Sequence, residues 1–351
     1  MPFYALFTGL ILSVFSTGST ASDLSDMLQR MTQADQNQNY QGIFILRKSD
    51  ELSSLRVTHG NDEKGIWETI EALNGEPRKV IRRNNKVVSI YPDRQLITIR
   101  HNKSDRSLHP RLPDNISQLD HFYAIEQMDN DRIANHQTLV INLKPKDKLR
   151  YGYRYWVDEN TGMLLRCDLV DENQTVVEQM MFTSLDYLHE TPQQPVTISQ
   201  FEQYNQKVLD ETAVIATGNS SATSAAGEEG VSAASQLPDA AAKSSAVSWQ
   251  VNILPKGFML TQSNLRHSSP SNAVNKQKPD LLHMVYSDGL ASVSVFIEKK
   301  LDEQSHLRGA SSMGAVNAFG HTVDGYAVTV VGEVPMKTVQ SMAQSTARVH
   351  K

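Results

Sequence analysis

The residues best suited to covalent chemistry are one cysteine, Cys167, and eleven histidines, and their spacing predicts neither an active site nor a metal site. A catalytic thiolate needs a base beside it, and the residues around Cys167 supply none. No two histidines follow a His-x-His or His-x-x-x-His pattern, which local metal sites usually show. The nucleophile elbow Gly-x-Ser-x-Gly and a glycine-rich phosphate loop are also missing. We therefore expect no enzyme and no cofactor, with a triad assembled from distant residues as the alternative.

Cys167 alternates with Leu165 and Leu169 along an expected strand. This pattern favours a small residue buried in the core, and an intermolecular disulfide is the alternative.

An aromatic strand points instead to noncovalent binding. Tyr151, Tyr153 and Tyr155 alternate and therefore share one face of the strand, and Trp156 follows them. Aromatic rings with polar tips suit a groove for an amphiphilic chain or a peptide. The alternative is that these rings form ordinary sheet core and rim.

Cations outnumber acids between residues 78 and 111, although the whole chain has a net charge of −5 and a pI near 6.1. The candidate basic patch comprises Arg78, Arg82, Arg83, Lys86, Arg94 and Arg100. Such a patch can meet the phosphates of a glycolipid or an acidic segment of a partner. Alternatively, the charges are spread over both faces of a solvated sheet. The overall acidity argues against nucleic acid as a partner.

The chain begins with a pattern typical of a secretory signal peptide. Residues 3–15 are almost wholly apolar and are followed by small residues, although the first four carry no Lys or Arg. We expect a signal peptide over residues 1–21, cleaved between Ala21 and Ser22, and hence a soluble periplasmic protein. The alternative is a buried helix of the folded domain.

Two domains joined by a flexible linker are expected from composition. Residues 211–247 are nearly all Ala, Ser, Gly and Thr, so they bury too little apolar surface to fold. The domains then cover residues 22–210 and 248–351, and 351 residues suffice for two cores.

The sequence of the larger domain predicts a long series of hairpins. A helix is expected over residues 24–36, another over 116–127, and turns at Asn74-Gly75 and at residues 158–162. The expected strands cover residues 40–47, 52–59, 65–73, 78–83, 86–91, 95–101, 138–143, 150–157, 163–170 and 175–188. About ten antiparallel strands twist too strongly to stay flat. The fold class is therefore mainly β (α+β), with a large half-open antiparallel β-barrel, covering helices and an apolar hollow.

The smaller domain is expected to be an α+β module. Strands are predicted over residues 249–254, 258–262, 281–286, 291–298 and 325–332, with turns at 255–257 and 287–289. A helix begins at Pro335 and places Val339, Met342 and Thr346 on one face.

Several of these segments resemble the RseB/MucB family. The similar segments, in order, are LQRM (28–31), NYQGIF (39–44), LRVTH (55–59), LNGEPR (73–78), YPDR (91–94), YGYRYWVD (151–158), TGMLL (161–165), LPKGF (254–258) and SDGLASVSVF (287–296). They span both expected domains in the same order, so the resemblance is specific. The long Ala/Ser-rich linker departs from the family pattern, which leaves the relative placement of the domains open.

The resemblance implies a non-enzymatic, periplasmic negative regulator of sigma-E in the envelope stress response. Such a protein would bind the periplasmic region of a membrane-spanning anti-sigma factor and shield it from proteolysis. Lipopolysaccharide or the acyl chains of lipoproteins would release it, and its large domain would be similar to the lipoprotein carriers. The resemblance transfers no site residues, and a homo-oligomer stays open. The alternative function is a periplasmic carrier of lipoproteins or lipids.

Overall fold

A computed structural model describes residues 21–101, 116–209, 248–266, 280–300 and 306–349. The expected linker and all but the last residue of the expected signal peptide lie outside these ranges. Ala21 and Ser22 form the first residues of helix α1 (Ala21–Asn37). Within the described ranges, no helix has the length and apolar character needed to cross a membrane.

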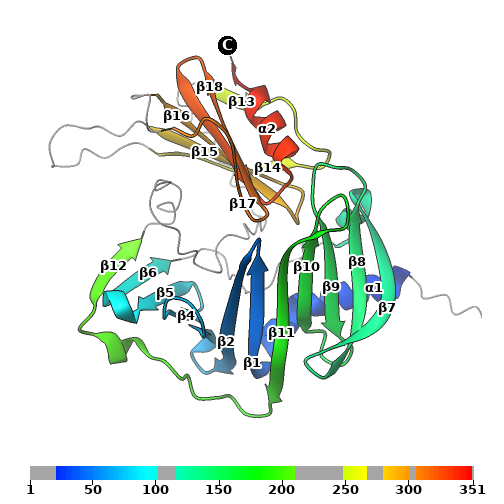
Figure 1. Cartoon of the computed structure of the whole chain (residues 1–351), viewed down its shortest axis with the longest axis vertical. Coiled ribbons are helices and arrows are strands. Elements are labelled where there is room, and N and C mark those ends of the chain that lie inside the picture. Colours follow the sequence, from blue (N-terminus) through cyan, green and yellow to red (C-terminus); the bar gives the residue numbers. More distant parts are fainter. Residues whose placement is uncertain (1–20, 102–115, 210–247, 267–279, 301–305, 350–351) are drawn as a thin grey trace, which may run out of the picture.

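The larger domain is built on one 12-stranded sheet. Its strands are β1 (Asn39–Lys48), β2 (Glu51–Asp62), β3 (Gly65–Ala72), β4 (Lys79–Arg83), β5 (Lys86–Tyr91), β6 (Leu96–His101), β7 (Tyr123–Ile133), β8 (His136–Pro145), β9 (Gly152–Asp158), β10 (Leu164–Val170), β11 (Val176–Leu188) and β12 (Asn205–Leu209). The order across the sheet is β12-β6-β5-β4-β3-β2-β1-β11-β10-β9-β8-β7. Strands β12 and β7 are edges that do not pair with each other, so the sheet curls without closing (Figure 1). The prediction of a half-open, mainly β domain is confirmed.

Two antiparallel meanders meet where β1 pairs with β11 along its whole length. The connection between β3 and β4, over residues 73–78, shows how local residues build the first meander. Asn74 beside the turn at Gly75 accepts a bond from the Ser54 amide, and Gly75 takes a φ of +70°. Non-glycine residues adopt that φ only at a steric cost, so the Asn-Gly pair predicted the hairpin correctly.

Helix α1 closes the inner face of the curled sheet and confirms the helix expected over residues 24–36. Its apolar side buries Met27, Leu28, Met31 and Ala34, and Leu28 is fully buried. These side chains join one apolar cluster with the inner faces of the central strands, including Tyr155 and Leu165. Burying a leucine completely contributes about 1.5–3 kcal/mol. Helix α1 is therefore held mainly by this packing.

A second, smaller cluster lies on the outer face of β4, β5 and β6. Ile81, Val88, Ile90 and Ile97 point outward there and are covered by Val196. The covering segment continues through the 3₁₀ turn η3 (Ile198–Phe201) into β12, which runs parallel to β6. This part of the sheet therefore has apolar layers on both faces.

The prediction of a helix over residues 116–127 is wrong. Those residues form a short 3₁₀ helix, η2 (Ile116–His121), and then enter strand β7. Most of β7 is exposed, because it is the last strand of the sheet. An exposed edge strand needs no apolar alternation, so the pattern used to recognise strands was absent. Strand β12 was missed as well.

The smaller domain contains a six-stranded antiparallel sheet and one covering helix. Its elements are β13 (Ser248–Val251), β14 (Met259–Arg266), β15 (Leu281–Ser287), β16 (Ser292–Lys299), β17 (Gly309–Met313), β18 (Val316–Val323), β19 (Tyr326–Gly332), α2 (Met336–Ser345) and β20 (Thr346–Val349). The sheet order is β14-β15-β16-β19-β18-β17, and β13 pairs separately with β20. Helix α2 packs on β18 and β19 through Val339 and Met342. The α+β prediction is confirmed, although β17, β18 and β20 were not expected.

Candidate functional site at the junction of the two domains

The aromatic strand β9 contributes to the inner core of the large domain. Tyr153 and Tyr155 are 5% and 0% exposed, and their rings stack with centroids 5.8 Å apart. Burial raises the pKa of both phenols well above the ordinary value, so both stay neutral. The Tyr155 hydroxyl has no hydrogen-bond partner among the described residues. A buried hydroxyl without a partner costs about 1–3 kcal/mol, so this interior has an unused polar group.

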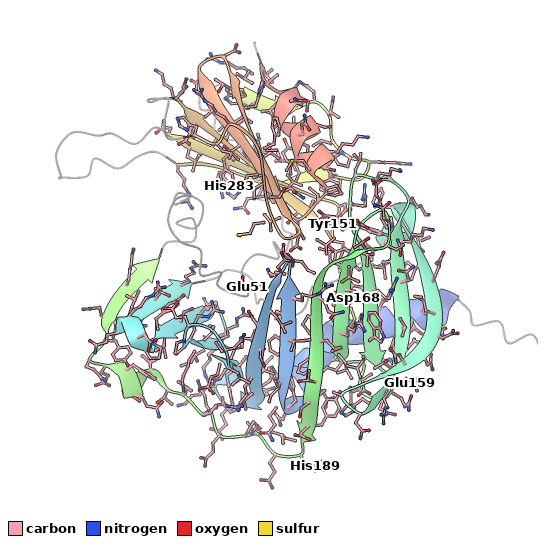
Figure 2. All side chains as sticks on the ribbon, in the orientation of Figure 1. Glu51, Tyr151, Glu159, Asp168, His189 and His283 are labelled. Carbon is pink, nitrogen blue, oxygen red and sulfur yellow. The ribbon has the colours of Figure 1, made fainter. Side chains whose placement is uncertain are left out.

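The other two candidate aromatic residues lie elsewhere. Trp156 faces the opposite side of β9, where its indole donates to Asp131 at 2.9 Å and lies 4.0 Å from the Arg166 guanidinium. Tyr151 precedes β9 and lies beside the smaller domain (Figure 2). The structure therefore brings Tyr153 and Tyr155 together but separates them from Trp156. All four side chains are buried in this conformation, so an open groove stays a prediction.

Tyr151 takes part in one of several hydrogen bonds that connect the large domain to the small one. The Asn317 amide of β18 donates to the Tyr151 hydroxyl at 3.1 Å and to the Val334 carbonyl at 2.8 Å. The Thr338 hydroxyl of α2 donates to the Leu149 carbonyl at 2.7 Å. The end of the large sheet that carries the tyrosines is thus bonded directly to the small domain.

The centre of this junction is a fully buried arginine, Arg150. Its guanidinium donates to the carboxylate of Asp147 at 2.9 Å in its own domain. Across the junction it pairs with the fully buried Asp288 and donates to the Lys256 carbonyl at 2.7 Å. The rings of Phe122, Tyr123 and Phe258 surround it, with centroids 5.1, 5.7 and 5.3 Å away.

This arrangement makes the two domains depend on each other. A buried charge is tolerated only when ionic and hydrogen-bonding partners replace the water it has lost. Arg150 takes one carboxylate from the large domain and one from the small domain. Separating the domains would expose Arg150 and Asp288 together, whereas removing one of them alone would leave an unpaired buried charge.

A second contact at the junction involves carboxylates from both domains. The Ala315 amide donates to Glu178 of β11 at 3.0 Å, and Ala315 is buried in the core cluster of the large domain. Glu178 also lies 3.7 Å from the Lys48 ammonium. Burial, together with the charge on Glu178, raises the pKa of Glu333 to about 7, while Lys48 opposes this rise. Glu333 follows β19 of the small domain. Its carboxyl group therefore lies at the junction, and its raised pKa places its titration near neutral pH.

The loop that presents Lys256 approaches the large domain very closely. Gly257 has a φ of +89°, and a Cβ placed there would overlap the Phe122 ring. Both the positive φ and the close approach require glycine at this position. The turn expected at residues 255–257 is therefore also a contact between domains.

The candidate basic patch is divided between the two faces of the sheet, as the alternative interpretation allowed. The register of β4 and β5 places Arg82 and Val87 on the inner side and Arg83 and Lys86 on the outer side. Ion pairs connect Arg82 to Glu68, Arg83 to Asp62 and Arg94 to Glu76. Arg78 and Arg100 also have interaction partners. Arg83 and Lys86 lie opposite each other across the hairpin, and Arg82 and Arg100 both flank Val87 on the inner side.

Cys167 is buried, and burial raises the pKa of its thiol well above the ordinary value. In the part of the chain that the structure describes, no three His, Cys, Asp or Glu side chains gather as a metal site would require.

Sequence reasoning singled out Tyr151 but missed most of the residues that form the junction. Arg150, Asp288, Asn317, Glu178 and Glu333 were not singled out, because each partner lies in a different expected element and often in a different domain. The one local signal was the turn at residues 287–289, which placed Asp288 correctly at a hairpin end but gave no indication of its partner.

Fold and junction together define a class: a two-domain, mainly β protein whose half-open sheet is joined to a small α+β domain by buried polar contacts. Comparison with family models gives the particular family. The MucB/RseB N-terminal domain matches residues 23–200, and the MucB/RseB C-terminal domain matches residues 243–347. The chain belongs to the MucB/RseB family.

Similar proteins extend over nearly the whole chain. The sigma factor AlgU regulatory protein MucB of Pseudomonas aeruginosa is 28% identical, over 97% of this chain and 95% of the relative. The sigma-E factor regulatory protein RseB of Haemophilus influenzae is 24% identical, over 96% of each chain. The Escherichia coli K12 RseB is 23% identical, over 97% of this chain and 95% of the relative.

Solved structures confirm the fold. The complex of Pseudomonas aeruginosa MucA and MucB superimposes with a TM-score of 0.63 and 23% identity, over 94% of this chain and 100% of the other. A crystal structure of MucB superimposes with a TM-score of 0.55 and 25% identity, over 94% of this chain and 99% of the other. A third structure contains MucB in complex with MucA(peri) and has a TM-score of 0.61.

Proposed function

We propose that this protein is an exported, periplasmic negative regulator of sigma-E. It binds the periplasmic region of a membrane-spanning anti-sigma factor and shields that region from proteolysis. The observation that carries the proposal is the family match over both domains, with relatives that regulate sigma-E or AlgU. The complexes of MucB with MucA support an anti-sigma factor as the partner. The apolar segment before Ala21 supports export.

The inner face of the large sheet is the proposed sensor. An acyl chain of lipopolysaccharide or of a lipoprotein would enter beside Tyr153 and Tyr155 and displace part of helix α1 from the apolar cluster. The apolar surroundings and the unpaired Tyr155 hydroxyl support an amphiphilic ligand there.

The junction is the proposed link between sensing and release. Tyr151 and Arg150 lie next to the sensor strand and are bonded to Asn317 and Asp288 of the small domain. A ligand that shifts Tyr151 would weaken these contacts and change the relative placement of the domains. Release requires that the ligand bind the rearranged state more tightly than the partner-bound state.

The test uses the mature chain, residues 22–351, in complex with the soluble periplasmic region of its anti-sigma factor. Titration with lipopolysaccharide below its aggregation threshold should dissociate the complex and restore cleavage of the anti-sigma region by a periplasmic protease. A complex that persists at saturating ligand would contradict the sensing role. Absence of any complex, combined with transfer of lipoprotein between membranes, would favour the carrier function instead.

A further inference from the structure

A pocket of about 390 Å³ lies on the outer face of the large sheet, away from the proposed sensor. Strands β4 and β5 form its floor, and the segment leading into η3 forms its wall. Its lining residues are Ile81, Arg83, Lys86, Val88, Gln194, Thr197, Ile198 and Ser199. Ligand pockets usually measure about 300–1,000 Å³, so this volume suits a small ligand or one end of a longer one.

The two cations of the pocket differ in how far they are neutralised. Arg83 donates two bonds to the Asp62 carboxylate, at 2.7 and 2.9 Å, and one to Gln194 at 3.1 Å. The bond from Arg83 lowers the pKa of Asp62 to about 2, so this pair stays ionised. Lys86 has no ion-pair partner among the described residues. Within the described part of the chain, the pocket therefore carries one positive charge without a carboxylate partner, at Lys86.

Arg83 lies directly opposite Lys86, and like charges that face each other across strands repel. Without a bound anion, this pair therefore destabilises the folded chain. The Arg83–Asp62–Gln194 contacts fix the pocket wall against the hairpin and keep the guanidinium beside Lys86. This arrangement gives an anion a position at the Lys86 ammonium, in a pocket that the ion-paired Arg83 also lines.

Below the cations, the pocket is apolar. Ile81 and Val88 are buried in the outer cluster, and Ile198 packs against the same cluster from the wall. The hydroxyls of Thr197 and Ser199 lie 2.9 Å apart and bond to each other. A matching ligand carries its charge at one end and a hydrocarbon chain at the other.

We propose that this pocket binds a single-chain anionic amphiphile, with its phosphate or carboxylate at Lys86 and its chain on Ile81, Val88 and Ile198. The volume accommodates one chain end, which excludes a ligand that inserts several acyl chains. An extended peptide is disfavoured, because β4 and β5 are each paired on both sides and offer no free strand edge. The site does not depend on anti-sigma factor binding.

The test is isothermal titration calorimetry of the mature chain alone, with probes kept below their micellar concentrations. Decyl phosphate and decanoate should each bind with one site at Lys86, whereas inorganic phosphate and decyltrimethylammonium should bind at least tenfold more weakly. Equal affinity for the anionic and cationic chains would overturn the role of the charge. Equal affinity for inorganic phosphate and decyl phosphate would overturn the role of the apolar floor.

Variants assign the binding to this pocket. Lys86→Gln should weaken decyl phosphate at least tenfold, and Ser199→Trp should abolish binding by filling the hollow. The matched control is Lys144→Gln, which removes an exposed lysine of β8 at the far side of the sheet. If Lys86→Gln and Lys144→Gln bind equally well, the amphiphile binds elsewhere and the proposal is wrong.

A photoreactive decanoate provides a second readout that does not depend on variant stability. Crosslinking should map to the β4–β5 hairpin and to the segment around Ile198. Crosslinks confined to α1 and β9 would place the chain in the proposed sensor and refute the outer site. A failed release experiment with lipopolysaccharide would leave this result unaffected, because no partner is present here.

Discussion

Substituting Asp288 with asparagine should open the junction between the domains. The change keeps the shape of the side chain and leaves an oxygen that can accept from the Leu290 and Ala291 amides, as Asp288 does at 3.0 and 2.8 Å. It removes the only carboxylate that the small domain offers to Arg150 among the described residues. The turn should therefore survive, while the ionic contact across the junction is lost.

The magnitude follows from the burial of the pair. Both side chains are 0% exposed, and removing one partner of a buried ion pair costs about 3–5 kcal/mol. Arg150 retains Asp147 at 2.9 Å and the Lys256 carbonyl at 2.7 Å, so the lower end applies. A loss of about 3 kcal/mol raises the ratio of open to closed molecules roughly a hundredfold.

The assay is urea unfolding followed by circular dichroism, with limited proteolysis at the junction in parallel. The parent chain should unfold with coupled domains, whereas Asp288→Asn should separate the transitions and speed cleavage around residues 147–150. A double-mutant cycle with Arg150→Met should give a coupling energy of about 2 kcal/mol or more. Lys148→Gln is the control, because its pair with Glu172 is exposed and contributes about 0–1 kcal/mol.

The reasoning would be refuted if Asp288→Asn lowered the free energy of unfolding by less than about 1 kcal/mol, or if the double-mutant cycle showed no coupling energy. Either result would mean that water reaches Arg150 and replaces Asp288.

Three further predictions concern single positions. The pKa of Glu333 is raised to about 7 from an ordinary 4.5, so between pH 4.5 and 7 the folded state holds a proton that the unfolded state has lost. The free energy of unfolding should therefore fall as the pH rises from 4.5 to 7. Urea titrations at each pH should show a flatter slope for Glu333→Gln. Gly257→Ala should lower stability by more than about 1 kcal/mol, because the left-handed φ and the Phe122 contact both oppose a Cβ; an unchanged melting temperature would contradict this close approach. Cys167 should resist thiol reagents in the native chain and react fully in denaturant, since it is buried with a raised pKa; rapid native labelling would show that the core opens.

Local chemistry in the sequence predicted most of the fold. Hairpins with Asn-Gly or Asp-containing turns were located correctly, because the turn residues determine the backbone there. Helix α1 was recognised because Met27, Leu28 and Met31 bury one face of a helix against the sheet. Both kinds of element can be recognised from residues that are close together in the chain.

The errors occurred where burial is weak. Strand β7 has exposed residues along most of its length. Strand β17 lies at the edge of the other sheet and consists of four small residues and Met313, all but Gly309 exposed. An edge strand is specified by its neighbour's hydrogen bonds rather than by its own apolar pattern. The expected helix over residues 116–127 arose from the same cause.

The candidate site illustrates a different limit of sequence reasoning. The alternation of Tyr153 and Tyr155 predicted their shared face correctly, but it could not tell a covered interior from an open groove, because α1 comes from another part of the chain. The split of the basic residues between two faces follows from strand register, which depends on how β4 and β5 pair.

Asp288 combines the local and the distant contributions in one side chain. One carboxylate oxygen accepts from two amides of its own turn, and the other pairs with Arg150, which lies 138 positions earlier in the chain. The first role is readable from Ser-Asp-Gly, whereas the second exists only after both domains have folded. Because the same carboxylate shapes a hairpin of the small domain and neutralises an arginine of the large one, a change in the relative placement of the domains must also alter the surroundings of that hairpin. This coupling is the physical reason to test the proposed release of a partner at the junction rather than within either domain.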